Sequence, residues 1–121
     1  DYTPVHTDTQ KIKRKGVSIS LELQPTKDIA SALGEMKHTA QFLVGFALET
    51  HDAEENAQLK LRKKNLDFIV LNSLEDEGAG FMTDTNKITI IDRYNKKTIY
   101  PLKEKKEVAK DIINKIEDIL Q

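Results

Sequence analysis

The sequence predicts an α/β fold with three layers, in which helices cover both faces of a partly parallel sheet. First, residues 41–46 and 67–71 are short apolar runs on either side of a helical pattern over residues 52–64. This strand–helix–strand order implies a parallel crossover. Second, residues 87–102 have the pattern of a β-hairpin. Third, residues 105–120 carry apolar side chains on one stripe of a helix that can cover the sheet.

The N-terminal quarter is predicted from weaker patterns. Residues 1–16 are polar and basic, and we expect them to form a flexible loop at the start of a single domain over residues 1–121. Residues 17–23 alternate apolar and polar side chains, which predicts a half-buried strand. Thr26 can then cap a short helix, which Gly34 is expected to end early.

The remaining elements follow in order along the chain. Residues 41–46 are predicted to form a central strand that is buried on both faces. The helix over residues 52–64 has acidic residues in its first turn and basic residues in its last, which matches the helix dipole. A loop with Gly78 and Gly80 precedes a hairpin whose strands are residues 87–91 and 98–102. Four strands make a thin sheet, so we expect further strands from another segment or subunit.

Composition excludes several classes of function. The formal net charge of −1 gives no overall positive field for nucleic acid. The chain has no cysteine, so it cannot form disulfides, thiolate metal sites or a cysteine nucleophile. No apolar run approaches the roughly 18 residues of a membrane span. We therefore expect a cytoplasmic protein that binds neither membranes nor nucleic acid.

A phenylalanine and two lysines flank the expected crossover. Ligands of open α/β sheets bind outside the carboxyl ends of the strands. Phe46 follows Gly45 at such an end and could stack on a base, although a core position is commoner for such a residue. Lys60 and Lys64 share one helix face, where an anion would relieve their repulsion. Solvated lysines near a helix C-terminus are the commoner explanation of this pattern.

A run of cations, Lys11-Ile12-Lys13-Arg14-Lys15, lies in the N-terminal segment. Such a cluster can neutralise phosphates. A solvated basic loop or a nucleic-acid patch is the alternative, although no aromatic side chains interleave with the charges. The three histidines lack metal-ligand spacing, so no protein metal site is predicted. There is no Gly-x-Gly-x-x-Gly and no Walker loop, so any glycine-rich phosphate turn lies outside this chain.

The order of these motifs resembles phosphopantothenate–cysteine ligase, also called phosphopantothenoylcysteine synthetase. The similarity is to the C-terminal half of the synthetase domain in bifunctional bacterial coenzyme A biosynthesis flavoproteins, and it covers essentially the whole chain. The motifs that carry it are Asp1, Lys11-Ile12-Lys13-Arg14, residues 21–29, Val44-Gly45-Phe46-Ala47-Leu48-Glu49-Thr50, Asn56-Ala57, residues 60–67 and residues 80–86.

The resemblance implies a reaction and a set of site residues. The family activates the carboxylate of 4′-phosphopantothenate with CTP, and cysteine then displaces CMP from the acyl-cytidylate. Lys11 matches the catalytic lysine, which would neutralise charge near the α-phosphate. The positions that match nucleotide-binding residues are Asp1, Lys11, Lys27, Asp28, Ile29, Ala30, Phe46, Lys60 and Lys64.

The sequence also departs from the family pattern. Leu48 replaces the second alanine of Gly-Phe-Ala-Ala-Glu-Thr, and Lys27 stands where proline is common. The N-terminal half of the synthetase, which holds the glycine-rich turn and the phosphopantothenate-binding residues, is missing. The resemblance therefore implies a Rossmann-like fold that is incomplete without that half, and a segment that is inactive in isolation.

Cofactors and partners are implied in the same way. Mg²⁺ is expected with CTP, because the triphosphate must be bridged and neutralised. FMN is expected only on a fused decarboxylase domain, which this chain does not contain. A homodimer is expected, in which the strand over residues 17–23 and its basic loop cross to the other subunit. The alternative is a non-catalytic nucleotide-binding or dimerisation module.

Overall fold

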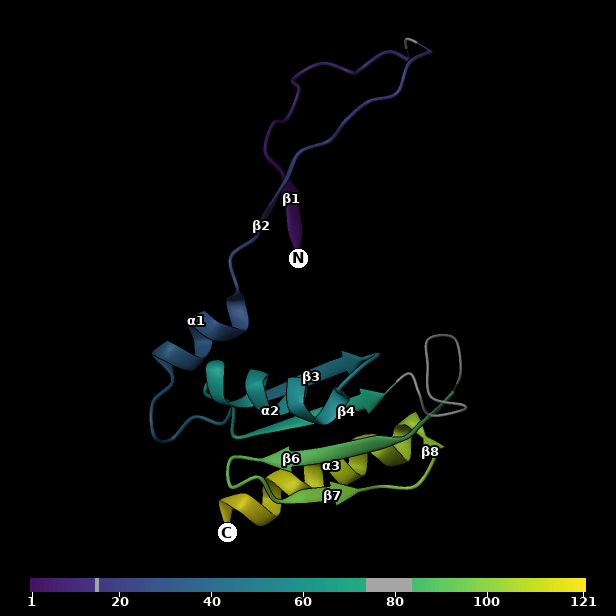
Figure 1. The fold of residues 1–121 in the computed structure, drawn as a ribbon. Helices are drawn as coiled ribbons and strands as arrows, with labels where there is room; N and C mark the ends of the chain where they lie inside the picture. Colours follow the sequence, from purple (N-terminus) through teal and green to yellow (C-terminus); the bar gives the residue numbers. More distant parts are fainter. Residues whose placement is uncertain (15, 74–83) are drawn as a thin grey trace.

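A computed structural model describes residues 1–14, 16–73 and 84–121 (Figure 1). The loop expected around Gly78 and Gly80 lies outside these residues. Within the described chain, residues 29–121 form a body of sheet and helices. Residues 1–28 extend away from that body, and we call them the arm.

The sheet of the body is mixed, as predicted. Its strands lie in the order β3 (Val44–Glu49), β4 (Phe68–Ser73), β6 (Ile88–Asp92) and β7 (Lys97–Ile99). β3 is parallel to β4, whereas β4 is antiparallel to β6 and β6 to β7. The parallel crossover and the hairpin are therefore confirmed. A separate short pair, β5 (Thr85–Asn86) and β8 (Lys103–Glu104), links the chain before β6 to the chain before the last helix.

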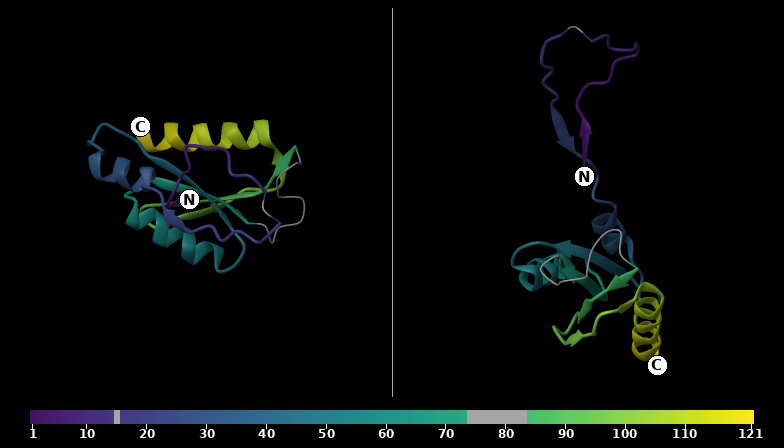
Figure 2. Two further views of the ribbon diagram at one scale, coloured as in Figure 1. Left: turned by 90° about the horizontal axis from the view of Figure 1, so that it is seen from above. Right: turned by 90° about the vertical axis from the view of Figure 1, so that its right-hand side faces the viewer.

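Helices cover both faces of this sheet. α2 (Ala53–Lys63) lies on one face and α3 (Lys105–Leu120) on the other, as the left view of Figure 2 shows. β4 serves both cores because its side chains alternate: Ile69 packs with the α2 layer and Val70 with the α3 layer. The predicted three layers are confirmed. Within the described ranges, neither α3 nor any shorter helix has the length and hydropathy of a membrane span.

The predicted helix stripes are largely buried. On α2, Ala57 and Leu61 are buried and Ala53 is partly buried against them. On α3, Val108 is buried, whereas Ile119 near the C-terminal end is 41% exposed. Local periodicity was sufficient here because α2 and α3 pack against strands that lie near them in the sequence.

The prediction of a central strand over residues 41–46 is wrong in two respects. The strand is β3, which begins at Val44, and it lies at the edge of the described sheet. Ala47 is buried toward α2, but Phe46 is 73% exposed and Leu48 is 38% exposed. An apolar run alone does not distinguish a central strand from an edge strand.

The first helix also differs from the prediction. α1 (Ile29–Met36) is capped by Asp28 and not by Thr26. Gly34 does not end α1, because the helix continues through Gly34 to Met36. Gly34 is buried, and a Cβ atom there would overlap the carbonyl oxygen of Lys64. The glycine is therefore explained by a close contact and not by a helix end.

The predicted strand over residues 17–23 is not formed in the single chain. The arm contains β1 (Tyr2–Pro4), which pairs with β2 (Leu23–Pro25), so residues 2–4 are a strand within the segment expected to be a loop. The alternating apolar side chains find no surface to cover within the described chain, and they are exposed by 49–73%: Val17, Ile19, Leu21 and Leu23.

Candidate functional site

The N-terminal end of α1 is organised by Asp28. One carboxylate oxygen of Asp28 accepts a hydrogen bond from the Ser31 amide at 3.0 Å. The other lies 3.2 Å from Nζ of Lys64 at the end of α2. The hydrogen bonds from Ser31 and the Lys64 ammonium lower the pKa of Asp28 from 3.8 to about 2. Asp28 therefore joins the start of α1 to one of the two candidate phosphate-binding lysines.

This depressed pKa gives a testable pH dependence. Because the pKa of Asp28 is lower in the folded state, the cap and the ion pair to Lys64 are intact above pH 3.8 and are lost as the pH falls through about 2. The Ser31 amide chemical shift, followed by NMR, should titrate with a midpoint near 2. In the Asp28→Asn variant, which keeps a capping oxygen but has no titrating carboxyl, this titration should disappear. A midpoint at or above 3.8 would contradict the assigned contacts.

Both candidate lysines of α2 are paired with carboxylates. Lys60 forms an ion pair with Glu49, the last residue of β3. Lys64 forms its ion pair with Asp28. Neither partner is on the same helix, so sequence spacing could not reveal them. The carboxylates relieve the repulsion between the lysines, and an entering phosphate would have to compete with them.

A large cavity lies where the arm meets the body. It has a volume of about 940 Å³ and is bounded by both strands of the arm, the start of α1 and the end of α2. Its lining residues are Asp1, Tyr2, Pro25, Thr26, Lys27, Asp28, Ile29, Ala30 and Lys64. Five of the predicted nucleotide-binding residues of the N-terminal segment are thus brought to one cavity, together with one lysine from α2.

A second cavity of about 350 Å³ lies between α1, β3 and α2. Phe46, Lys60 and Lys64 all line it. It shares Ile29, Ala30 and Lys64 with the large cavity, so the two spaces adjoin. Phe46 is 73% exposed, which excludes a core role within the described chain and leaves its ring face accessible. The arrangement offers an aromatic surface beside two cations, which suits a base and its phosphates.

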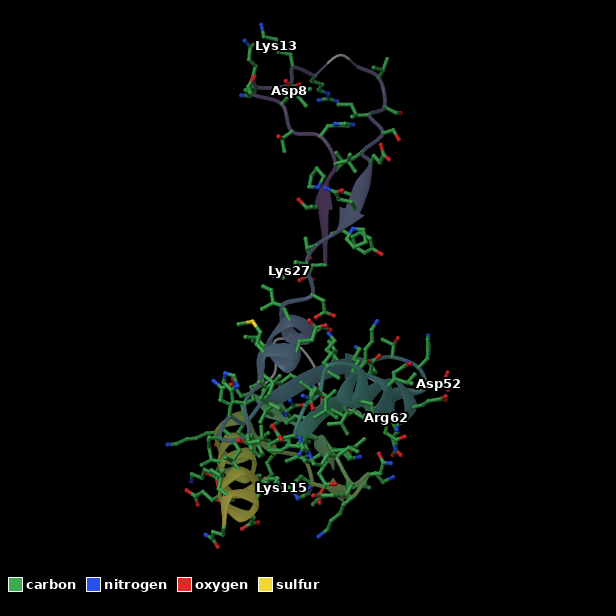
Figure 3. The ribbon with its side chains drawn as sticks, turned by 90° about the vertical axis from the view of Figure 1, so that its left-hand side faces the viewer. Asp8, Lys13, Lys27, Asp52, Arg62 and Lys115 are labelled. Atoms are coloured by element: carbon green, nitrogen blue, oxygen red, sulfur yellow. The ribbon has the colours of Figure 1, made fainter. Side chains whose placement is uncertain are left out.

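Lys11 is not brought to these cavities within one chain. It belongs to the segment from Asp8 to Lys13, which Figure 3 shows at the far end of the arm. Lys27 lies at the base of the arm, above α1 (Figure 3). The predicted catalytic lysine and the predicted nucleotide-binding residues are therefore separated by the length of the arm.

Sequence reasoning missed one polar residue near Phe46. Asn72 ends the apolar run of β4, and it lines a cavity of about 320 Å³ on the α3 side of the sheet, together with Phe46 and Lys105. Its Oδ1 atom is buried and has no hydrogen-bond partner within the described part of the chain. A polar residue at the carboxyl end of a buried strand is the signal that could have found it.

The described residues provide no preformed metal centre. Within residues 1–14, 16–73 and 84–121, no three histidine or carboxylate side chains gather closely enough to hold a metal ion. The carboxylates nearest the candidate lysines, Asp28 and Glu49, are engaged by those lysines.

A comparison with known protein families identifies the family of this chain. A model of the DNA/pantothenate metabolism flavoprotein C-terminal domain matches residues 1–120. The chain belongs to this family. The family predicted from the order of the motifs is thereby confirmed.

Curated relatives of this flavoprotein family are much longer than the chain. A cysteine/cysteine sulfinic acid decarboxylase from an unknown prokaryotic organism is 57% identical over 116 residues, which are 96% of this chain and 32% of that protein. The coenzyme A biosynthesis bifunctional protein CoaBC of Bacillus subtilis (strain 168) is 43% identical over 96% of this chain and 28% of its own length. The chain thus spans about a third of the relatives it matches.

Solved structures of the family confirm the α/β, Rossmann-like fold. The C-terminal domain of a CoaBC protein has a TM-score of 0.70 and 46% identity, and the match covers 82% of this chain and 47% of that chain. A DNA/pantothenate metabolism flavoprotein from Streptococcus pneumoniae has a TM-score of 0.71 at 23% identity, over 90% of this chain and 46% of that one, which supports the fold alone.

Proposed function

We propose that this chain is the nucleotide-binding half of a phosphopantothenate–cysteine ligase that acts in coenzyme A biosynthesis. The observation that carries the proposal is the pair of adjoining cavities at the arm, α1, β3 and α2. Their walls combine the exposed ring of Phe46 with Lys60 and Lys64. Membership in a family that includes CoaBC proteins supports the assignment.

In the proposed reaction, the carboxylate of 4′-phosphopantothenate attacks the α-phosphorus of CTP. The bond from that phosphorus to the bridging oxygen breaks, and pyrophosphate leaves. The amine of cysteine then attacks the acyl carbon, loses a proton, and displaces CMP to form the amide. Lys60 and Lys64 would hold the β- and γ-phosphates, and Lys11 would neutralise charge at the α-phosphate.

Mg²⁺ fits this proposal as a companion of the nucleotide. Magnesium is commonly held by substrate phosphates and one or two carboxylates, with water completing its shell. Asp28 and Glu49 supply carboxylates close to the two lysines, but each is already paired with a cation. If phosphates took their place on Lys60 and Lys64, these carboxylates would be free to hold the metal. The metal would neutralise triphosphate charge that the two lysines alone do not balance.

The proposal also includes a second copy of the chain. The arm holds the segment from Asp8 to Lys13, which includes Lys11, away from the body (Figure 3). Its alternating apolar residues are exposed. A homodimer in which each arm lies along the partner would cover those residues and bring Lys11 to a nucleotide. The remaining wall of the active site, including the phosphopantothenate-binding residues, would come from the N-terminal half of the synthetase.

Ligand-dependent thermal unfolding tests this proposal. CTP with Mg²⁺ should raise the unfolding temperature, and at a hundredfold excess over Kd the stabilisation should be about 2.7 kcal/mol. ATP with Mg²⁺ and a short single-stranded RNA serve as controls and should have smaller effects. Stabilisation by RNA without any by CTP would refute the ligase assignment.

The second candidate is a non-catalytic nucleotide-binding or dimerisation module. It is favoured by the observation that Lys11, the proposed catalytic residue, is not among the residues that line the two adjoining cavities. The two candidates differ in turnover. Pyrophosphate release from CTP that depends on 4′-phosphopantothenate, measured on the complete gene product, supports the ligase. CTP binding without such release supports the module.

A further inference from the structure

α1 carries the start of the nucleotide pocket, yet apolar packing does not hold it on the body. Its larger apolar side chains are largely exposed, Ile29 by 69%, Leu33 by 49% and Met36 by 70%, and none of them belongs to either core cluster of the described residues. The buried residue of α1, which is described in full, is Gly34. The position of Ile29 and Ala30 must therefore be set by other contacts.

Those contacts converge on the turn that follows α2. Nδ2 of Asn65 donates a hydrogen bond to the carbonyl oxygen of Gly34 at 2.9 Å. Nζ of Lys37, just after α1, donates to the carbonyl oxygen of Asn65 at 2.7 Å and lies 3.0 Å from Oδ2 of Asp67. The Lys37 side chain is only 9% exposed. We call Gly34, Lys37 and Asn65 the α1 clamp.

Gly34 and Asn65 are not the residues that helix propensity and helix C-capping would favour at their positions. Glycine inside a helix is less stable than alanine, but a Cβ atom at Gly34 would overlap the Lys64 carbonyl oxygen. Asn65 has φ of +50° and follows the C-cap of α2, and the amides of Asn65 and Leu66 bond back to Arg62 and Leu61. Glycine is the usual residue at this left-handed position.

Asparagine at position 65 tolerates the left-handed conformation and adds an amide group that tethers α1. Both residues thus take part in the same contact between α1 and the turn after α2. Lys64 contacts α1 near both of its ends: Gly34 packs on the Lys64 carbonyl oxygen, and Asp28 binds the Lys64 ammonium.

We infer that the α1 clamp positions the nucleotide pocket, so that Gly34, Lys37 and Asn65 are positioning residues for the binding of the cytidine moiety. This inference rests on the proposed function. The clamp fixes α1 against the lysine that faces the phosphates, and so fixes the spacing between the pocket for the nucleoside and the pocket for the phosphates.

The test uses the complete gene product with the variants Asn65→Gly and Gly34→Ala, and Lys63→Gln on exposed α2 surface as the control. Asn65→Gly keeps a residue suited to the left-handed turn and removes only the tether. We expect faster amide hydrogen exchange over residues 29–36, and about tenfold weaker binding of both CTP and CMP, as loss of one hydrogen bond allows. Lys63→Gln should change neither.

Replacing glycine with alanine usually stabilises a helix, but Gly34→Ala should destabilise the packing of α1 on the body. In a free helix, alanine would strengthen α1. Here it should displace α1, speed exchange in residues 29–36 and weaken CTP binding more than Asn65→Gly does. Slower exchange in Gly34→Ala, or unchanged exchange in Asn65→Gly, would overturn the clamp. If the unmodified protein fails to bind CTP, the proposed function is refuted, and the exchange rates still decide whether the clamp holds α1.

Discussion

Replacing either Lys60 or Lys64 with alanine should weaken CTP binding by about tenfold to a hundredfold, and CMP binding by no more than about threefold. A charge-assisted hydrogen bond contributes roughly 1.5–3 kcal/mol, and only the triphosphate presents β- and γ-oxygens to these ammonium groups. Removing Lys60 also leaves Glu49 without its partner beside the phosphates, which adds repulsion. Calorimetric titration with both nucleotides measures the difference directly.

Two further variants separate charge from position. Lys63→Ala removes a cation from the exposed surface of the same helix, so it should leave both affinities unchanged. In Glu49→Gln, the carboxylate that competes for Lys60 is gone, so CTP binding measured without Mg²⁺ should tighten. With Mg²⁺ present the gain should be smaller, because the variant also loses a proposed magnesium ligand. Equal losses for CTP and CMP in the lysine variants would show that the lysines do not contact the β- and γ-phosphates.

The sequence predicted the body well because its patterns are local. The stripe of α2 and the apolar run of β4 lie within one short stretch, and each buries its side chains against the other. The contacts of the candidate site could not be predicted as well, because its ion pairs join residues that are distant in sequence. Lys64 is 36 positions from Asp28. No periodicity within α2 encodes that partner.

Gly34 shows a second limit of prediction from sequence alone. A glycine in a helical pattern reads equally well as a helix end or as a close contact. The carbonyl oxygen of Lys64, which makes alanine impossible there without movement, is contributed by another helix. Likewise, the alternation of residues 17–23 correctly indicates side chains that require a partner surface. The single chain supplies none within its described residues, so no strand forms.

Replacing Lys11 with alanine should reduce kcat by about a hundredfold to ten-thousandfold, as loss of a transition-state charge stabiliser does, while the Kd for CTP changes little. Lys11 belongs to the far end of the arm and is not among the residues that line the two cavities, so the lining of those cavities is unchanged in the variant. Single-turnover assays of pyrophosphate release, combined with CTP titration, separate the two effects.

Mixing Lys11→Ala with Lys64→Ala, at a CTP concentration well below the weakened Kd of Lys64→Ala so that neither variant alone is active, then shows which chain receives each Lys11. If every arm serves the partner, a hybrid of Lys11→Ala with Lys64→Ala has one site whose cavity and arm are both unaltered. Random exchange at equal amounts should restore about a quarter of the unmodified activity, since half of the dimers are hybrids with one working site of two. If the arm folds back onto its own chain, each hybrid site carries one defect and activity stays absent. Restored activity would explain why the apolar residues of the arm are exposed in a single chain: they are the surface that places a catalytic lysine in the partner's site.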